Sequence, residues 1–340
     1  MRRIFTLLVG SAIFILGGFS VSGQSLSLEG SIDSDSGTVY LNYVSDDAYY
    51  RRGSGSLEVA VHNGKFVFQD SLAFPSAFQL LYKADKTDSV WKYISGIFLL
   101  QPGSQTIRCH VDSMFAIPDV DNAGTKEWKA WAVGIPGNGT GMYRLAYVRA
   151  HPDSYVVLWD LISILGNGYK PIFDSIYEGL SVAIKSSYPG MVLRKRLKSL
   201  AQTAQGRIFP AAVLADEGGH EVRFSGATVH ARYTLVDFWF SHCGPCIGRF
   251  RDLKAVYMKH GGRDLQIVAI STDGQKDLGE WHAVIQREGF DWKRYLDKGG
   301  PFAHQLSIFN YPTNFLLDEK GVIVKRNIMP AELEKILDGL

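Results

Sequence analysis

The 340-residue sequence predicts an α/β fold for its C-terminal part, preceded by a helical connector and by an N-terminal antiparallel, β-sandwich-like domain. Three observations predict this arrangement. Short alternating apolar stretches recur up to about residue 115 without a helical pattern between them. Apolar residues at helical spacing follow. Beyond residue 206, strand and helix patterns alternate, which is typical of a central sheet covered by helices. The expected parts are residues 1–23, 24–115, 116–205 and 206–340.

Residues 1–23 are expected to be a secretory signal peptide. Arg2 and Arg3 precede an apolar stretch from Ile4 to Phe19, and Val21-Ser22-Gly23 offers small residues for cleavage. The stretch is short for a membrane span, which favours cleavage over an uncleaved anchor. We therefore expect a periplasmic protein with no stable membrane span after signal cleavage, in a compartment where disulfides persist.

The composition is that of an ordinary globular protein. The chain is 46% hydrophobic and 21% charged, and 36 Lys and Arg against 34 Asp and Glu leave a net charge of +2. This balance gives no reason to expect a nucleic-acid partner.

The N-terminal domain is expected to be built from short strands. Thr38–Tyr43 alternates in polarity, and Leu57–Val61 and Lys65–Phe68 flank Asn63-Gly64, a strong signal for a tight hairpin. The role of this domain stays open. A non-enzyme alternative is that it binds a partner protein or a glycan, with Tyr49-Tyr50-Arg51-Arg52 as a loop cluster and the C-terminal part as an accessory.

Cys109 is the one cysteine outside the C-terminal part. Alternation places Ile107, Cys109 and Val111 on one strand face, so a buried free thiol is the favoured interpretation. The alternative is a third redox cysteine that docks on Cys243.

The connector is expected to be mainly helical. Trp128 and Trp131 are spaced to pack one helix on a core, and Asp153 or Ser154 caps the next helix. The charged run Arg194–Lys198 is expected to be a solvated helix face.

A Cys-x-x-Cys motif is the main chemical signal in the C-terminal part. The apolar run Leu235–Phe240 predicts a strand buried on both faces, and His242-Cys243-Gly244-Pro245-Cys246 follows it. Gly244 and Pro245 stand between the cysteines and, with His242, are expected to tune the redox pair. Pro245 suits a first helical turn. Both thiols would therefore lie at a helix N-terminus, where the dipole and free N–H groups lower the pKa of the first cysteine.

Two other interpretations of the motif remain. A structural zinc site needs four ligands, and the sequence has neither a second Cys-x-x-Cys nor a paired-histidine spacing to supply them, so no metal is expected. A purely structural disulfide is the second alternative. The redox interpretation is favoured over both.

The stretch from about Gly206 to Leu340 resembles the TlpA/ResA-like envelope thioredoxin family, through Val236-Asp237-Phe238-Trp239, Cys243-Gly244-Pro245-Cys246 and Tyr311-Pro312-Thr313. The resemblance implies a thioredoxin fold. It also implies that Asp237 is a buried carboxylate that relays protons to the second thiol. Pro312 would be a cis proline beside the cysteines, and Trp239, Tyr311 and Thr313 would border the substrate. The strand-rich N-terminal part resembles a small β domain of unknown function that often precedes such thioredoxin domains.

One departure from the family concerns redox tuning. The family usually has Trp before the first cysteine, whereas this chain has His242. An exposed histidine is one interpretation. The other is that protonated His242 stabilises the Cys243 thiolate and makes the pair more oxidising at low pH.

We expect a thiol-disulfide oxidoreductase without a cofactor that reduces protein disulfides. Its partners would be disulfide-bearing envelope proteins and a membrane thiol-disulfide electron donor. A disulfide isomerase or oxidase would use the same residues at another potential. A thiol peroxidase is a weaker alternative, because its Pro-x3-Thr-x2-Cys motif would need Pro and Thr where this chain has Val236 and Phe240.

Overall fold

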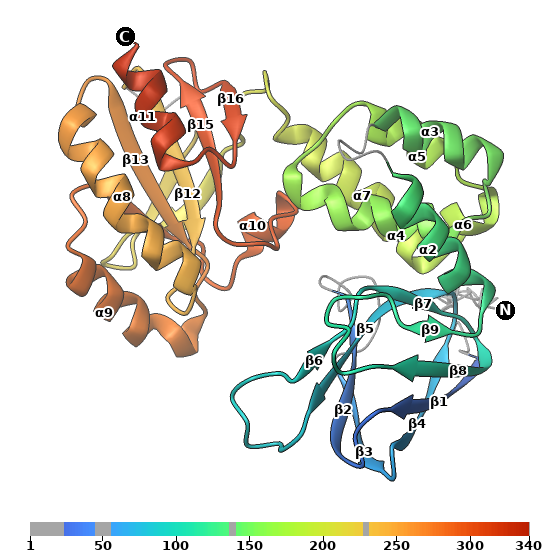
Figure 1. Ribbon diagram of the computed structural model, residues 1–340. Helices are drawn as coiled ribbons and strands as arrows, with labels where there is room; N and C mark the ends of the chain where they lie inside the picture. The colour runs from blue at the N-terminus through green and yellow to red at the C-terminus, as the bar shows by residue number, and fades with distance from the viewer. Residues whose placement is uncertain (1–23, 45–55, 136–140, 227–230, 340) are drawn as a thin grey trace, which may run out of the picture.

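The computed structural model describes residues 24–44, 56–135, 141–226 and 231–339. Strands come first in the chain, helices second, and alternating strands and helices last, as the sequence predicts (Figure 1). The expected signal peptide and the Tyr49–Arg52 cluster lie outside the described residues. Within the described ranges, no helix combines the length and the apolar character that a membrane crossing requires.

The N-terminal domain is a nine-stranded sheet in the order β6-β5-β2-β3-β4-β1-β8-β9, with β7 paired to β5. Its strands are β1 (Gln24–Ile32), β2 (Ser36–Tyr43), β3 (Leu57–His62), β4 (Lys65–Leu72), β5 (Ser76–Lys83), β6 (Tyr93–Ile94), β7 (Phe98–Leu100), β8 (Gly103–Cys109) and β9 (Asp119–Val120). The pairs are antiparallel except for β1 with β8, which is parallel. That pairing joins strands far apart in sequence, so local alternation does not reveal it.

The predicted hairpin joins β3 and β4. Asn63 has φ 49° and Gly64 has φ 70°. Two consecutive positive φ angles are what the favoured two-residue hairpin turn requires, and Asn-Gly tolerates them best.

The connector is helical, and its core is continuous with one end of the β domain. Its helices are α2 (Ala123–Gly134), α3 (Gly141–Ala150), α4 (Tyr155–Ile164), the 3-10 turn η1 (Leu165–Asn167), α5 (Ile172–Gly179), α6 (Val182–Ser186) and α7 (Tyr188–Gln202). Ser154 caps α4 by accepting the Val157 N–H. Trp128 and Trp131 are buried in one apolar cluster with Ala77 of β5, so their predicted packing on a core is confirmed.

The prediction that Arg194–Lys198 forms a solvated helix face is wrong for Arg196, which is only 1% exposed. Arg196 shares the buried stripe of α7 with Leu193, Leu197 and Leu200. Its guanidinium lies over the Phe309 ring, 4.9 Å from the ring centroid. The three leucines pack in the connector core, whereas Arg196 is covered by Phe309 of the C-terminal domain.

The C-terminal sheet has seven strands in the order β11-β10-β14-β13-β12-β15-β16. The strands are β10 (Ala212–Ala215), β11 (Glu221–Phe224), β12 (Tyr233–Trp239), β13 (Leu265–Ser271), β14 (Lys293–Leu296), β15 (Thr313–Asp318) and β16 (Ile323–Arg326). The helical elements are α8 (Gly244–His260), the 3-10 turn η3 (Gln275–Asp277), α9 (Leu278–Glu288), α10 (Pro301–Gln305) and α11 (Pro330–Asp338). The central strands β12, β13 and β14 are parallel, and β15 is antiparallel to β12.

Both faces of β12 are buried, which explains its continuous apolar run. Leu235 and Trp239 face the cluster formed with α8, α9 and α11. Val236 and Phe238 face a second cluster that includes Phe302 of α10. Because both faces of β12 are covered, the chemistry of the C-terminal domain lies at the carboxyl end of this strand, where open α/β sheets place their sites.

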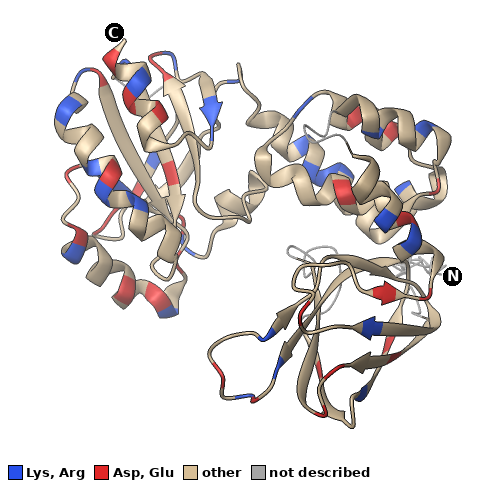
Figure 2. Ribbon diagram, in the orientation of Figure 1, with Lys and Arg blue, Asp and Glu red and all other residues tan. Residues whose placement is uncertain are grey.

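Acidic and basic residues are interspersed over all three parts of the described chain (Figure 2).

Candidate active site

Cys243 and Cys246 form a disulfide at the start of α8. Cys243 is the N-cap, and its Sγ accepts the Cys246 N–H at 3.2 Å. Cys243 is 4% exposed and Cys246 is completely buried. When the pair is reduced, the helix N-terminus favours a thiolate on Cys243, which is the cysteine nearer the surface.

Gly244 and Pro245 form the exposed turn between the cysteines. Pro245 stands in the first turn of α8, where its missing N–H costs no hydrogen bond. Apart from its two chain neighbours and the nearby backbone of α8, no heavy atom of the described residues lies within 4 Å of the position that a Cβ on Gly244 would take. The surface beside the disulfide is therefore open to an approaching chain.

The Tyr311–Pro312 peptide bond is cis, and β15 begins at the next residue. Thr313 pairs with Phe238 near the end of β12, so the pairing of β15 with β12 brings the proline loop to the strand end that leads to Cys243. Tyr311 packs edge-on against Phe240, with ring centroids 5.3 Å apart. Burial raises the pKa of the Tyr311 hydroxyl.

The expectation that Trp239 borders the substrate is not supported. Its side chain has no exposed surface and packs edge-on against Phe250 and Phe290. Thr313 is 2% exposed, and its hydroxyl donates to the Asn310 carbonyl. Because both side chains are buried, neither can contact a partner, and they pack inside the domain instead. Tyr311 is the one of the three expected side chains with partial exposure.

Asp237 is buried in β12, as the resemblance implies, and is 1% exposed. Its Oδ1 lies 2.6 Å from Nη2 of Arg249, whose side chain is 11% exposed. Burial raises the pKa of Asp237 and Arg249 lowers it. Burial is the larger influence, so the net pKa is about 6. The sequence analysis missed Arg249. The available signal was its position three residues after Cys246, which places both side chains on one side of α8.

His242 is exposed, with 63% of its side chain accessible. Its Nε2 lies 3.5 Å from Oδ1 of Asp277 at the end of η3. The structure therefore places His242 at the surface beside a carboxylate, and its exposure agrees with the first interpretation. An effect of its charge on the Cys243 thiolate stays a prediction.

A buried carboxylate holds the loop that leads into Cys243, and the sequence analysis missed it as well. Asp273 is 3% exposed and accepts the Ser241 N–H at 3.0 Å and the Ser241 hydroxyl at 2.7 Å. The Ser271 hydroxyl donates to it at 2.5 Å. The available signal was an acidic residue just after a buried parallel strand, next to the strand that ends at the cysteines.

The connector contacts the segment that leads to Pro312. The Ser199 hydroxyl donates to the Gln305 carbonyl, and Arg196 stacks on Phe309. A Cβ built on Gly166 would lie 2.6 Å from Nδ2 of Asn310. The sequence analysis gave no sign of this contact, because it joins residues from two different parts of the chain.

Cys109 is a buried free thiol in the β domain, so the favoured interpretation is confirmed. It is 2% exposed. Burial raises the pKa of its thiol to about 12. A thiol with this pKa is a poor nucleophile and a poor candidate for a third redox cysteine.

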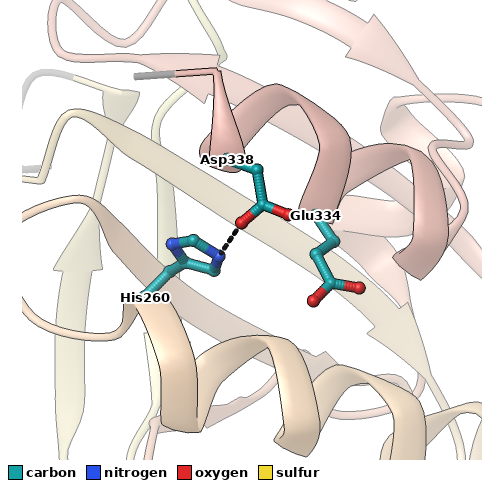
Figure 3. A group of neighbouring side chains, drawn as sticks. All are labelled: His260, Glu334 and Asp338. Atoms are coloured by element: carbon teal, nitrogen blue, oxygen red, sulfur yellow. Dashed lines mark ion pairs between the residues drawn. The ribbon is translucent and has the colours of Figure 1, made fainter.

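Figure 3 shows His260, Glu334 and Asp338, whose side chains converge between α8 and α11. Nε2 of His260 lies 3.1 Å from Oδ1 of Asp338. Nζ of Lys259 lies 2.6 Å from Asp338 and 3.2 Å from Glu334. Because an ammonium group already pairs with both carboxylates, this cluster is an ion-pair network that ties the two helices together.

Comparisons with known proteins found a family and several relatives that this chain resembles. Residues 205–326 match the AhpC/TSA family. The chain is 27% identical over 104 residues to sporulation thiol-disulfide oxidoreductase A of Bacillus subtilis, a match covering 30% of this chain and 63% of that protein. It is 24% identical over 134 residues to thiol-disulfide oxidoreductase ResA of Bacillus thuringiensis, covering 39% of this chain and 75% of that one. The chain thus spans less than two thirds of the first of these relatives.

Solved structures give matches of the same kind. A thiol-disulfide oxidoreductase from Bacteroides fragilis is 27% identical, with 39% of this chain and 100% of that chain covered and a TM-score of 0.35. A thioredoxin-like protein from Bacteroides caccae is 15% identical, with 64% and 85% covered and a TM-score of 0.48. The sequence matches confirm the family resemblance stated from the motifs.

Proposed function

We propose that this chain, whose C-terminal part is a thioredoxin-like domain related to the thiol-disulfide oxidoreductases, reduces disulfides of proteins in the cell envelope. The observation that carries the proposal is the Cys243–Cys246 disulfide at the N-terminus of α8, which follows the strand that carries the buried Asp237 and pairs with β15 after the cis proline.

The reaction follows from the different positions of the two thiols. In the reduced protein, the Cys243 thiolate attacks a substrate disulfide and forms a mixed disulfide, and one substrate sulfur leaves with the electron pair. Cys246 then loses its proton and attacks Sγ of Cys243. This second attack forms the Cys243–Cys246 disulfide and releases the other substrate sulfur. The two electrons pass to the substrate, so a thiol donor must re-reduce the protein.

The environment of the cysteines supports exchange with a polypeptide rather than a peroxide. A peroxidase of the Pro-x3-Thr-x2-Cys type would need a hydroxyl at position 240, where Phe240 instead packs on Tyr311. The exposed turn at Gly244 and Pro245 leaves room for an extended substrate chain beside the disulfide.

The envelope location and the partners are part of the same proposal. Arg2, Arg3 and the apolar stretch that follows support export. In that compartment, the substrates would be disulfide-bearing proteins, and a membrane thiol-disulfide protein would supply electrons. Cell fractionation and N-terminal sequencing of the exported protein test this. A mature chain that starts near Gln24 is expected, and a full-length protein in the cytoplasm would contradict it.

The reduction potential of the Cys243–Cys246 pair tests the direction of electron flow. Equilibration of the full chain in thiol buffers should give a value near that of thioredoxin, roughly −270 mV. A value of roughly −120 to −180 mV would instead indicate an oxidase or isomerase. A Cys243→Ser/Cys246→Ser variant is the control for signals from Cys109. If no reversible couple appears, the oxidoreductase proposal itself fails.

A further inference from the structure

Arg249 carries a largely buried positive charge that has no role in the thiol chemistry described so far. It lies on α8 three residues after Cys246, and its side chain is 11% exposed. Its Nη2 lies 2.6 Å from Oδ1 of Asp237. Burying a guanidinium is costly, because it keeps its charge at any pH that the protein meets. A buried position for this charge next to the redox pair therefore calls for an explanation.

The ion pair occupies one oxygen of the carboxylate. Oδ2 of Asp237 is buried and has no hydrogen-bond partner among the residues that the structure describes. Cys246 is fully buried as well, so water cannot readily take the proton of its thiol. Since Cys246 and Arg249 project from the same side of α8, the carboxylate that binds Arg249 lies on the side of the helix that carries Cys246.

The other elements around Asp237 bring no second charge of this strength. Its register partners are Ala269 on β13 and Asn314 on β15, and both are uncharged. Burial is the largest influence on the pKa of Asp237 and raises it. The charge and hydrogen bond of Arg249 and the Asn314 amide lower it, and the net result is a pKa of about 6. Without Arg249, the two largest influences that oppose burial would be lost, and the pKa of Asp237 would rise further.

We propose that Arg249 is a positioning residue that keeps Asp237 ionised, with Oδ2 free to accept the Cys246 thiol proton when Cys246 resolves the mixed disulfide. The inference rests on the proposed function and deepens it. In this step the proton passes from Cys246 to Asp237, the Cys246–Cys243 bond forms, and the bond between Cys243 and the substrate sulfur breaks. The substrate sulfur leaves with the electron pair, and Asp237 later returns its proton to solvent.

Dithiobis(nitrobenzoate) separates the two steps in the reduced full chain. Attack by Cys243 releases one coloured thiolate, and resolution by Cys246 releases a second. Arg249→Met should slow the second release at pH 7 by about twofold if the Asp237 pKa rises to about 7 and by about tenfold for each further unit, and should move its pH midpoint upward. The first release should change much less. Arg249→Lys, which keeps the charge, should restore most of the second phase.

Two comparisons decide the outcome. In an Asp237→Asn background, Arg249→Met should slow the second release no further. An equal slowing with and without Asp237 would show that Arg249 acts directly on the thiolate, and it would overturn the proposal. Identical pH profiles for wild type and Arg249→Met would overturn it too. If Arg249→Met does not fold, Arg249→Gln, which keeps a donor but not the charge, takes its place. A wild-type chain that never gives the second release would refute the proposed function instead.

Discussion

Replacing Asp237 with asparagine should stabilise the C-terminal domain relative to wild type increasingly as the pH rises. The carboxyl group is 1% exposed, and its pKa is raised from 3.8 to about 6. The folded state therefore binds a proton more tightly than the unfolded state does. An acid with a raised pKa contributes full stability below its unfolded pKa, and this stability is lost as the pH rises through the folded pKa.

The size of the effect follows from the shift. One pKa unit corresponds to about 1.4 kcal/mol, so wild type should lose about 3 kcal/mol in total relative to Asp237→Asn, about 2 kcal/mol of it between about pH 4.5 and 7. The asparagine amide inherits the unpartnered position of Oδ2, which costs roughly 1–3 kcal/mol at every pH. The pH-dependent part of the difference is therefore the quantity to measure.

Hydrogen exchange of β12 peptides in the oxidised full chain is the suitable assay, because a chain with several domains does not unfold in one transition. Protection should fall with pH in wild type more than in Asp237→Asn. A difference that stays constant over this range would refute the raised pKa. A difference of opposite sign would show that attraction to Arg249 outweighs the cost of burial.

Three further predictions concern other parts of the structure. The reduced native protein should react with an aromatic disulfide at two thiols and the denatured protein at three, because Cys109 is buried; three fast thiols in the native state would contradict this. Gly321→Ala should cost at least about 1–2 kcal/mol from its backbone alone, since Gly321 has φ +75°, and the new Cβ would lie 2.2 Å from the Gly226 carbonyl oxygen; hydrogen exchange of β15 and β16 peptides checks this, and unchanged protection would refute it. His242→Ala should make the pair about 10–20 mV less oxidising than wild type at low pH; parallel potentials at all pH values would exclude a role for a charged imidazole beside Asp277.

Local signals predict the redox centre well. The apolar run before Cys243 implied a strand buried on both faces, and this also predicted the burial of Asp237. Pro245 in a first helical turn implied that the cysteines begin a helix. Tyr311-Pro312-Thr313 was informative only through the family resemblance, because a proline before a strand is ordinary. The chemical roles of these residues stay predictions.

The errors and omissions have a common physical cause. Arg196 and Arg249 stand on helices where charged residues usually face water, and their burial depends on surfaces that distant parts of the chain provide. Trp239 fits the family motif, but both faces of β12 are covered, so its indole is enclosed in the core. The parallel pairing of β1 with β8 depends in the same way on contacts far apart in sequence.

The contacts of Arg196, Ser199 and Gly166 with residues 305–310 have a consequence for how this molecule is dissected. Pro312 follows that segment by two residues. A bulky partner that binds near Pro312 would therefore meet a surface formed by both the connector and the C-terminal domain. Residues 206–340 expressed alone would keep the cysteines but expose Phe309 and a new rim. Small disulfides should react alike with both forms, whereas exchange rates with folded proteins measured on the fragment would describe a different surface from the one that the full chain presents.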